Sequence, residues 1–274
     1  MRHYTYVFLA IVLVGGLSAQ TTPVVANNGT VNAASFAVGT PVAPGSLVAI
    51  FGTSLASGVA SADSIPLSTS LGGATVVFQG SSGSFNAPLL FATDGTNGVG
   101  AQINAQIPWE LTPAAGTTET VNVMVTVGGV QSAPAPVTIT TAAPGIFAIG
   151  NNAVVTNLDG TLVWAPNTVA GISSHPAAPG DAIIMYANGL GPVDSPIKDG
   201  ANSEDKLRNT VNMPAVLIGG VSAQVLFSGL NPAFVGLNQI NVVVPNVPAG
   251  NAVPIQIQMN GITTASTLTI AISQ

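Results

Sequence analysis

The side chains that could carry acid–base or nucleophilic chemistry are few and scattered. After the first 20 residues the chain holds one histidine, His175, and it has no cysteine anywhere. A serine hydrolase needs a serine, a histidine and an acid brought together. Because His175 is followed by Pro176 and lies close to the Pro179-Gly180 turn, we interpret it as a loop residue without a catalytic task. The sequence also contains no Gly-x-Ser-x-Gly elbow and no glycine-rich phosphate loop followed by lysine.

Ten carboxylates could in principle supply a hydrolytic pair. They are Asp63, Asp94, Glu110, Glu119, Asp159, Asp181, Asp194, Asp199, Glu204 and Asp205. Glycoside hydrolysis needs two of them facing each other across a cleft. Only Glu110 and Asp181 fall in segments that recur in the chain, and their counterparts are Val247 (or a neighbour) and Ser46. The recurrence therefore supports no pair, and we predict no catalytic residue.

The densest acidic segment, residues 194–205, is the place where a calcium ion would bind. It lacks the Asp-x-Asp-x-Asp spacing of calcium loops, and Lys198, Lys206 and Arg208 compete for its carboxylates. These three are the basic residues of the chain after residue 20, so the clusters of Lys and Arg that nucleic acids require are missing. We expect a solvated surface loop, no metal, no cofactor and no nucleic-acid partner.

Aromatic residues could instead form a platform on which a sugar stacks. Trp109 follows a proline at a strand end, and Trp164 lies in an expected hairpin. For both we expect packing in the core or at a domain interface. Phe51 and Tyr186 occupy matching positions in two apolar segments, and we expect them in the core.

The elements that must position these residues are predicted to be strands. Residues 121–127, 255–259 and 267–272 alternate apolar and polar side chains, which is the pattern of half-buried strands. Asp159-Gly160, between two apolar runs, predicts a hairpin turn. Glycine and proline recur too often to leave room for a long helix.

The chain also repeats itself. Residues 43–51 recur as 178–186, 89–91 as 225–227, 99–108 as 235–245 and 127–130 as 259–262, always in the same order. Leu71-Gly72-Gly73 matches Ile218-Gly219-Gly220 at a larger spacing, which predicts about eleven extra residues in the first copy, around residues 79–88. The second copy carries the charged loop 194–208 instead. Four ordered matches indicate two copies of one fold.

We therefore expect an all-β protein built from two tandem immunoglobulin-like β-sandwich domains related by internal duplication. The predicted divisions are a signal peptide at residues 1–19, an N-terminal extended segment at 20–34, and β-sandwich domains at 35–143 and 144–274. The boundary lies within residues 143–154, and the short linker favours a fixed pair of domains.

The first 19 residues have the layout of a secretory signal, with Arg2 at the start, an apolar centre from Tyr6 to Val14, and small residues before a cleavage site after Ala19. The apolar centre is shorter than the roughly 20 residues of a membrane span. We expect a protein that is secreted or held at the cell surface, without a membrane span in the mature chain.

Several of the recurring segments carry a family resemblance. Residues 31–36, 43–52, 103–110, 143–147 and 189–193, including the run Ile-Asn-Ala-Gln-Ile-Pro-Trp-Glu, resemble a secreted domain of unknown function abundant in soil acidobacteria such as Solibacter. The likeness covers about residues 30–272. In that family the domain is often the C-terminal part of larger secreted proteins. The resemblance implies export and fold, and it supplies no catalytic residues.

Composition favours a protein that works through its surface. Charged residues make up only 5% of the chain, so its surface repels neighbours weakly. We predict an extracellular, non-catalytic structural or adhesive module that contacts other proteins or copies of itself. A specific form is a self-assembling fibre or surface-layer subunit, joined by edge-strand pairing or by strand donation, with residues 20–35 as the candidate donor. The alternative is a carbohydrate-binding module on extracellular polysaccharide, and an enzyme ranks third.

Overall fold

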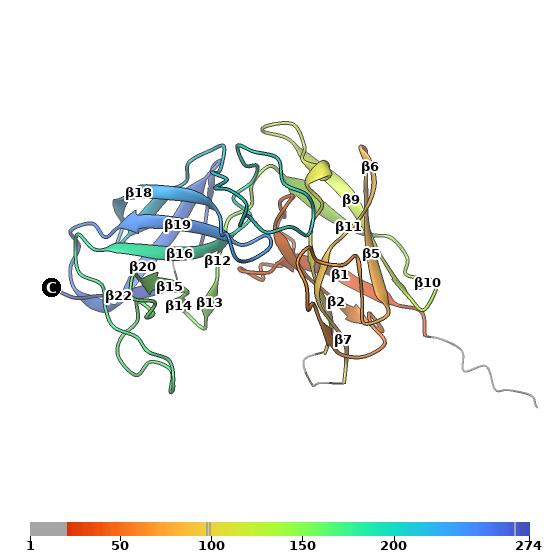
Figure 1. The fold of residues 1–274 in the computed structure, drawn as a ribbon, viewed down its shortest axis with the longest axis horizontal. Helices are drawn as coiled ribbons and strands as arrows, with labels where there is room; N and C mark the ends of the chain where they lie inside the picture. The colour runs from red at the N-terminus through yellow and green to blue at the C-terminus, as the bar shows by residue number, and fades with distance from the viewer. Residues whose placement is uncertain (1–20, 97, 99, 266) are drawn as a thin grey trace, which may run out of the picture.

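The protein is built almost entirely from β-strands. The computed structural model describes residues 21–274 except positions 97, 99 and 266 (Figure 1). Besides strands, the regular elements described there comprise one 3-10 turn, η1 (Trp109–Leu111). The predicted all-β class is thus confirmed. The expected signal peptide lies outside the described residues. Among the described residues no helix is long and apolar enough to cross a membrane.

Two sheets face each other in the first half of the chain, which we define as residues 24–140. One sheet contains, in spatial order, β1 (Val24–Asn32), β2 (Leu47–Thr53), β8 (Gly100–Gln106), β7 (Leu89–Gly95) and β3 (Ala60–Ser61). The other contains β10 (Val130–Gln131), β9 (Thr118–Val127), β5 (Ala74–Gly80) and β4 (Ser70–Leu71), with β11 (Ala135–Thr140) beside β9 and β6 (Gly83–Asn86) beside β5. Side chains from both sheets, such as Ile50, Ile103 and Val123, share one buried core, as in a β-sandwich.

A single curled path of strands encloses the core of the second half, residues 145–272. Its order is β12 (Gly145–Ile146), β16 (Ala182–Asn188), β19 (Asn238–Val243), β18 (Val221–Leu230), β17 (Ala215–Ile218), β20 (Gly250–Met259), β22 (Thr269–Ile272), β14 (Asn152–Ala153) and β13 (Ala148–Ile149). β15 (Val155–Asn157) adds to β16, and β21 (Ile262–Thr263) adds to β20. β18 pairs with β17 at its start and with β19 at its end. Strands from all parts of the path therefore contribute to one core.

The alternating segments are strands whose apolar side faces the core, as predicted. The valines at 121, 123, 125 and 127 on β9 are buried, and so are Ile255, Ile257 and Met259 on β20. The hairpin turn at Asp159-Gly160 is confirmed, because Thr156 and Leu162 form an antiparallel bridge across it.

The two halves share a pattern of strand pairing. In the first, Ile50 of β2 lies opposite Ile103 of β8, and in the second, Met185 of β16 lies opposite Ile240 of β19. The next strand in each half, β7 or β18, contains a register shift at the same place, after Leu89 and after Val225. This common pairing agrees with the repeat in the sequence. Descent of the halves from one duplicated module stays a prediction.

The predicted eleven-residue insertion around residues 79–88 is wrong. β5 pairs with β9, and its counterpart β17 pairs with β20. The Gly219-Gly220 turn that follows β17 therefore corresponds to the Ser81-Ser82 turn that follows β5, and not to Gly72-Gly73. All four glycines have positive φ. The same turn chemistry suits any two-residue hairpin, so matching glycine pairs did not identify matching hairpins.

The N-terminal segment is also misplaced by the prediction. Residues 24–32 do not stand outside the first sandwich but form β1, which pairs with β2 of the same chain. Val25 lies opposite Gly52 and Thr30 opposite Ile50, with a register shift between them where Asn28 adopts φ 53°. The sequence Asn27-Asn28-Gly29 is typical of a turn, but in the structure it forms a bulge within a continuous strand. Residues 24–32 are therefore not an unpaired donor strand.

Phe51 and Tyr186 were expected in the core, and this is wrong. Both are only partly buried. The core positions of β2 and β16 are taken by neighbours such as Ile50 and Met185, and alternation turns the two aromatic rings to the other face of their sheets. The Phe51 ring lies 6.4 Å from that of Phe36.

The chain passes between the two cores over a short distance. Ile139 is the last residue of the first core and Ala142 is the first of the second. Each sheet in the described part of the chain draws its strands from one half. The halves lie side by side in Figure 1, and polar groups join them.

Candidate functional site: the junction of the two halves

A cluster of buried amides holds the halves together, and we call Asn32, Leu47, Ala143 and Asn188 the amide node. Asn188 is fully buried. Its side-chain oxygen accepts from the Leu47 N–H at 2.9 Å, and its Nδ2 donates to the Leu47 carbonyl at 2.7 Å and to Asn32 Oδ1 at 3.0 Å. Asn32 Nδ2 donates to the Ala143 carbonyl at 2.8 Å. Because these groups are neutral and mutually satisfied, the node holds at any ordinary pH.

Sequence reasoning missed this node. Asn32 and Asn188 are the last residues of β1 and β16. Asn188 follows a run of apolar residues, so its position at a strand end was the available signal, whereas Asn32 follows a mixed, largely polar segment that gives no such signal. The structure shows that both strand ends meet at the junction.

A second contact docks a loop of the second half onto the first. Gly200 N–H donates to Gln106 Oε1 at 2.7 Å, and the Gly200 carbonyl accepts from Leu67 N–H at 2.8 Å. Beside it, the Trp109 N–H donates to Asp199 Oδ1 at 3.0 Å. Gly200 has φ +74°, and a Cβ there would lie 2.9 Å from the Leu67 carbonyl oxygen. Only glycine fits this close approach.

Two carboxyl groups meet in that contact. Burial raises the pKa of Asp199 to about 6. The hydrogen bond from the Trp109 N–H lowers this pKa, whereas the charge of Glu110 and a hydrogen bond to the Glu110 carboxyl raise it further. Glu110 was a candidate from the sequence, in which the recurrence supported no pair, and the structure brings it together with Asp199. The partner comes from the charged loop of the other half. Carboxyls in direct contact leave no room for a sugar between them, unlike the separations of glycosidases, at least about 5 Å.

Arg208 organises the docked loop from within. Its side chain is buried, and it donates to Asp205 Oδ2 at 3.0 Å, to the Pro196 carbonyl at 3.1 Å and to Ser203 Oγ at 3.2 Å. The fork of the guanidinium suits this set of acceptors. The prediction of a solvated loop is therefore wrong for Arg208 and for Asp199.

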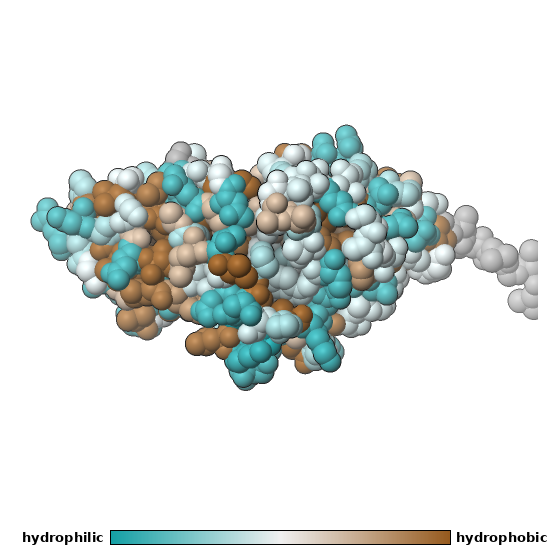
Figure 2. All heavy atoms as spheres, turned by 90° about the horizontal axis from the view of Figure 1, so that it is seen from above, coloured by the Kyte–Doolittle hydropathy of each residue, from teal (hydrophilic) through white to brown (hydrophobic). Residues whose placement is uncertain are grey.

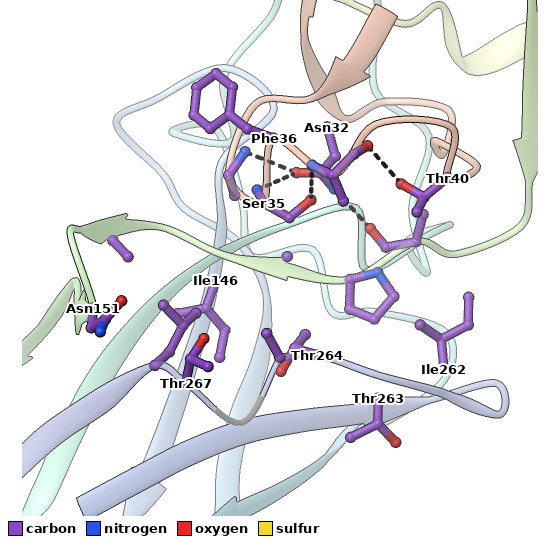
Figure 3. Close-up of a pocket in the computed structure, with 18 of the residues that line it drawn as sticks. Asn32, Ser35, Phe36, Thr40, Ile146, Asn151, Ile262, Thr263, Thr264 and Thr267 are labelled. Carbon is purple, nitrogen blue, oxygen red and sulfur yellow. Dashed lines mark hydrogen bonds between the residues drawn. The ribbon is translucent and has the colours of Figure 1, made fainter. Parts of the chain in front are cut away.

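An apolar cleft opens beside the amide node, and Figure 3 shows its lining. It has a volume of about 640 Å³ and is lined by residues between 32 and 41 of the first half, by Ala143 and Pro144 of the crossing, and by residues between 145 and 151 and residues 262–265, 267 and 268 of the second half. Ile146 and Leu268 belong to its apolar lining, and Phe36, 52% exposed, stands at its rim. None of the described residues that line it carries an ionisable side chain.

His175 pairs with an acid but not with a nucleophile. Its Nε2 lies 3.1 Å from Asp159 Oδ2, and its Nδ1 lies 2.9 Å from the Pro176 carbonyl. The Pro176 carbonyl and the Asp159 carboxylate raise the pKa of His175. Hydrogen bonds from the Thr161 hydroxyl and N–H lower the pKa of Asp159 to about 2, and His175 adds a smaller effect in the same direction. Ser174 Oγ donates to the Ala165 carbonyl instead. The group is an ion pair on a hairpin, and its neighbouring serine is not activated.

The tryptophans pack inside the protein, as predicted. Trp164 is 1% exposed, and its Nε1 donates to the Ala153 carbonyl at 2.7 Å. The Trp109 ring lies against Gly45, where a Cβ would overlap it. Its Nε1 is buried without a hydrogen-bond partner in the described structure.

Two of the remaining acidic candidates serve local structure. Asp181 accepts from the Ala178 N–H at 2.7 Å, closing its own turn. Asp194 accepts from the N–H of Asn209 at 3.1 Å and from its Nδ2 at 2.7 Å. Among the described residues no three His, Asp or Glu side chains gather in a way that could hold a metal ion.

Comparison with known proteins identifies no family. No family model matches the sequence, and no curated protein does. Among solved structures, the C-terminal domain of the AgI/II polypeptide BspA of Streptococcus agalactiae is similar at 11% identity, over 86% of this chain and 95% of that one, with a TM-score of 0.21. A structure named BspA_C_WT is similar at 12% identity over 86% and 96%, also with a TM-score of 0.21. The functional argument therefore rests on the chain's own residues.

Proposed function

We propose that this chain is an extracellular, non-catalytic structural or adhesive module that acts by protein–protein contact, including contact with copies of itself. The observation that supports this most directly is the apolar cleft at the junction. A catalytic cleft gathers titratable groups with shifted pKa values, whereas none of the described residues that line this cleft can ionise. Such a site can bind, and it has no acid or base to offer.

Exposed apolar side chains support contact with a protein. Val38, Leu158 and Leu207 are each at least 70% exposed. Figure 2 shows apolar residues gathered over the second half and beside the junction. Exposed apolar patches mark sites of association, and the low charge of the chain opposes contact between copies only weakly.

Sedimentation velocity over a wide concentration range tests self-contact. We expect the wild type to associate as its concentration rises. Phe36→Asp and Ile262→Asp place a charge at the rim of the cleft, and both should stay monomeric. Asp is suited to position 36 because Phe36 has φ 51°. Val59→Asp is the matched control, since Val59 is exposed but does not line the cleft. A wild type that stays monomeric at high concentration would contradict self-contact.

A second candidate function is binding of a neutral polysaccharide, and one repeated arrangement favours it. Phe51 lies opposite Gln102, and Tyr186 lies opposite Gln239, in matching registers. Each glutamine donates from Nε2 to an asparagine on its own strand, Asn104 at 2.6 Å and Asn241 at 2.9 Å.

Each half thus places an aromatic ring beside an uncharged amide pair on one sheet face. Amides can both donate to and accept from sugar hydroxyls, and directly opposite side chains act together. Affinity electrophoresis in neutral polysaccharides tests this function. Phe51→Ala and Tyr186→Ala should each reduce retardation, and Phe234→Ala, which removes an exposed ring elsewhere, should not. Wild-type protein that migrates without retardation would contradict it.

A further inference from the structure

The docked loop of the second half depends on a carboxyl pair that can change its charge. Three hydrogen bonds attach consecutive residues Asp199 and Gly200 to Leu67, Gln106 and Trp109 of the first half. Two of the three join uncharged groups. The third uses the Asp199 carboxyl, which lies partly buried against Glu110.

Few other charges bear on Asp199. From the first half, Glu110 is the charged group that raises its pKa. Within the loop, Lys198 is exposed, and Asp205 is engaged by Arg208. The first-half residues that bond the docked loop, Leu67, Gln106 and Trp109, are neutral. Ionising Asp199 therefore places two negative charges in contact with little to offset them.

We propose that residues 194–208 form a pH-sensitive latch, docked on the first half while the Asp199 carboxyl is protonated beside Glu110 and loosened when the Asp199 carboxyl ionises. The latch does not depend on the proposed function. The amide node carries no titratable group, so the halves stay joined while the loop opens.

The size of the effect follows from linkage. The pKa of Asp199 is about 6 in the docked loop, and its ordinary value is 3.8. The docked state binds the proton more tightly, so docking is most favourable at low pH and weakens as pH rises from about 4 to about 6 and beyond. Between pH 5 and 7.5 the opening constant rises by up to about tenfold. Partial exposure of Asp199 makes this an upper bound.

Amide hydrogen exchange of the full mature chain tests the latch. After correction for the intrinsic pH dependence of exchange, we expect opening at the Trp109 and Gly200 amides to increase severalfold from pH 5 to 7.5. The Leu47 amide at the amide node is the internal control and should not change. In Asp199→Asn, which keeps the Oδ1 acceptor but cannot ionise, the two latch amides should be equally protected at both pH values.

A second measurement needs no variant. The chemical shifts of the wild-type Trp109 and Gly200 amides should titrate together with a midpoint near pH 6, and Glu110→Gln should move that midpoint lower. Equal wild-type protection at pH 5 and 7.5, or an undiminished rise in Asp199→Asn, would overturn the proposal.

Discussion

Asn188 donates a hydrogen bond to Asn32 across the junction at 3.0 Å, and both side chains are buried. The bond joins the final residue of β16 to the final residue of β1. Apolar packing alone would allow two surfaces to slide, whereas a satisfied amide network permits one arrangement. The junction is therefore specified by polar groups although each half is stabilised by an apolar core.

Removing one amide should expose this role. Asn188→Ala leaves the Leu47 N–H without its acceptor, whereas the Leu47 carbonyl still accepts from the Ala33 N–H. We expect a loss of about 1–3 kcal/mol in the free energy of unfolding, the cost of leaving that N–H unsatisfied, measured by chemical denaturation. Asn202→Ala is the control, because the Asn202 amide makes only a long contact at 3.5 Å, and it should cost less than about 0.5 kcal/mol. Equal stability of the two variants would show that the node is dispensable.

The close packing of Trp109 on Gly45 leads to a second prediction about stability. Gly45 and Gly39 both have φ close to +72°, but a Cβ at Gly45 would lie 2.1 Å from the Trp109 ring, and one at Gly39 would meet nothing within 4 Å. Gly39→Ala should cost about 1–2 kcal/mol for its backbone alone. Gly45→Ala should cost a further 1–3 kcal/mol or so, since the ring must move. Thermal unfolding of both variants measures the difference, and similar melting temperatures would contradict the packing of Trp109 on Gly45.

The contact between His175 and Asp159 leads to a prediction about the pKa of His175. Each imidazole nitrogen faces an acceptor, which favours the doubly protonated ring and raises its pKa. Its contribution to stability is present below pH 6.5 and is lost as pH rises through the folded value. That of Asp159 is present above pH 3.8 and is lost toward pH 2. Asp159→Asn should therefore lower the pKa of His175 in an NMR titration, and an unchanged pKa would contradict the pairing.

The parts of the fold that the sequence predicted are those governed by local pattern. Alternation from Val121 to Val127 marks a strand because one sheet face is buried. Strand β1 was not predicted because a bulge at Asn28 and Gly29 interrupts its alternating pattern. Phe51 was misplaced because matching positions in two strands reveal equivalence and do not show which face is buried.

The junction could not be predicted in the same way. Glu110 and Asp199 are far apart in sequence and lie in different halves, and neither stands in a recognisable spacing. Their contact depends on how the two cores dock, which is decided by Asn32 and Asn188. The carboxyl pair is thus a consequence of tertiary arrangement, and its raised pKa depends on burial that composition does not reveal.

Arg208 gives the last prediction, because the loop that carries Asp199 is arranged around it. In Arg208→Lys the charge remains, but a lysine ammonium cannot reproduce the fork that reaches Asp205, Ser203 and the Pro196 carbonyl together. Loss of charge-assisted hydrogen bonds in a buried setting should cost about 1.5–3 kcal/mol. Because the loop is held to the first half by few bonds, the cost should appear locally. We expect faster exchange at the Gly200 amide at every pH, with the Leu47 amide unchanged. Arg208→Lys differs from Asp199→Asn in this respect, since it loosens the latch without removing its dependence on pH. Unchanged exchange at Gly200 would show that the loop holds its shape without Arg208.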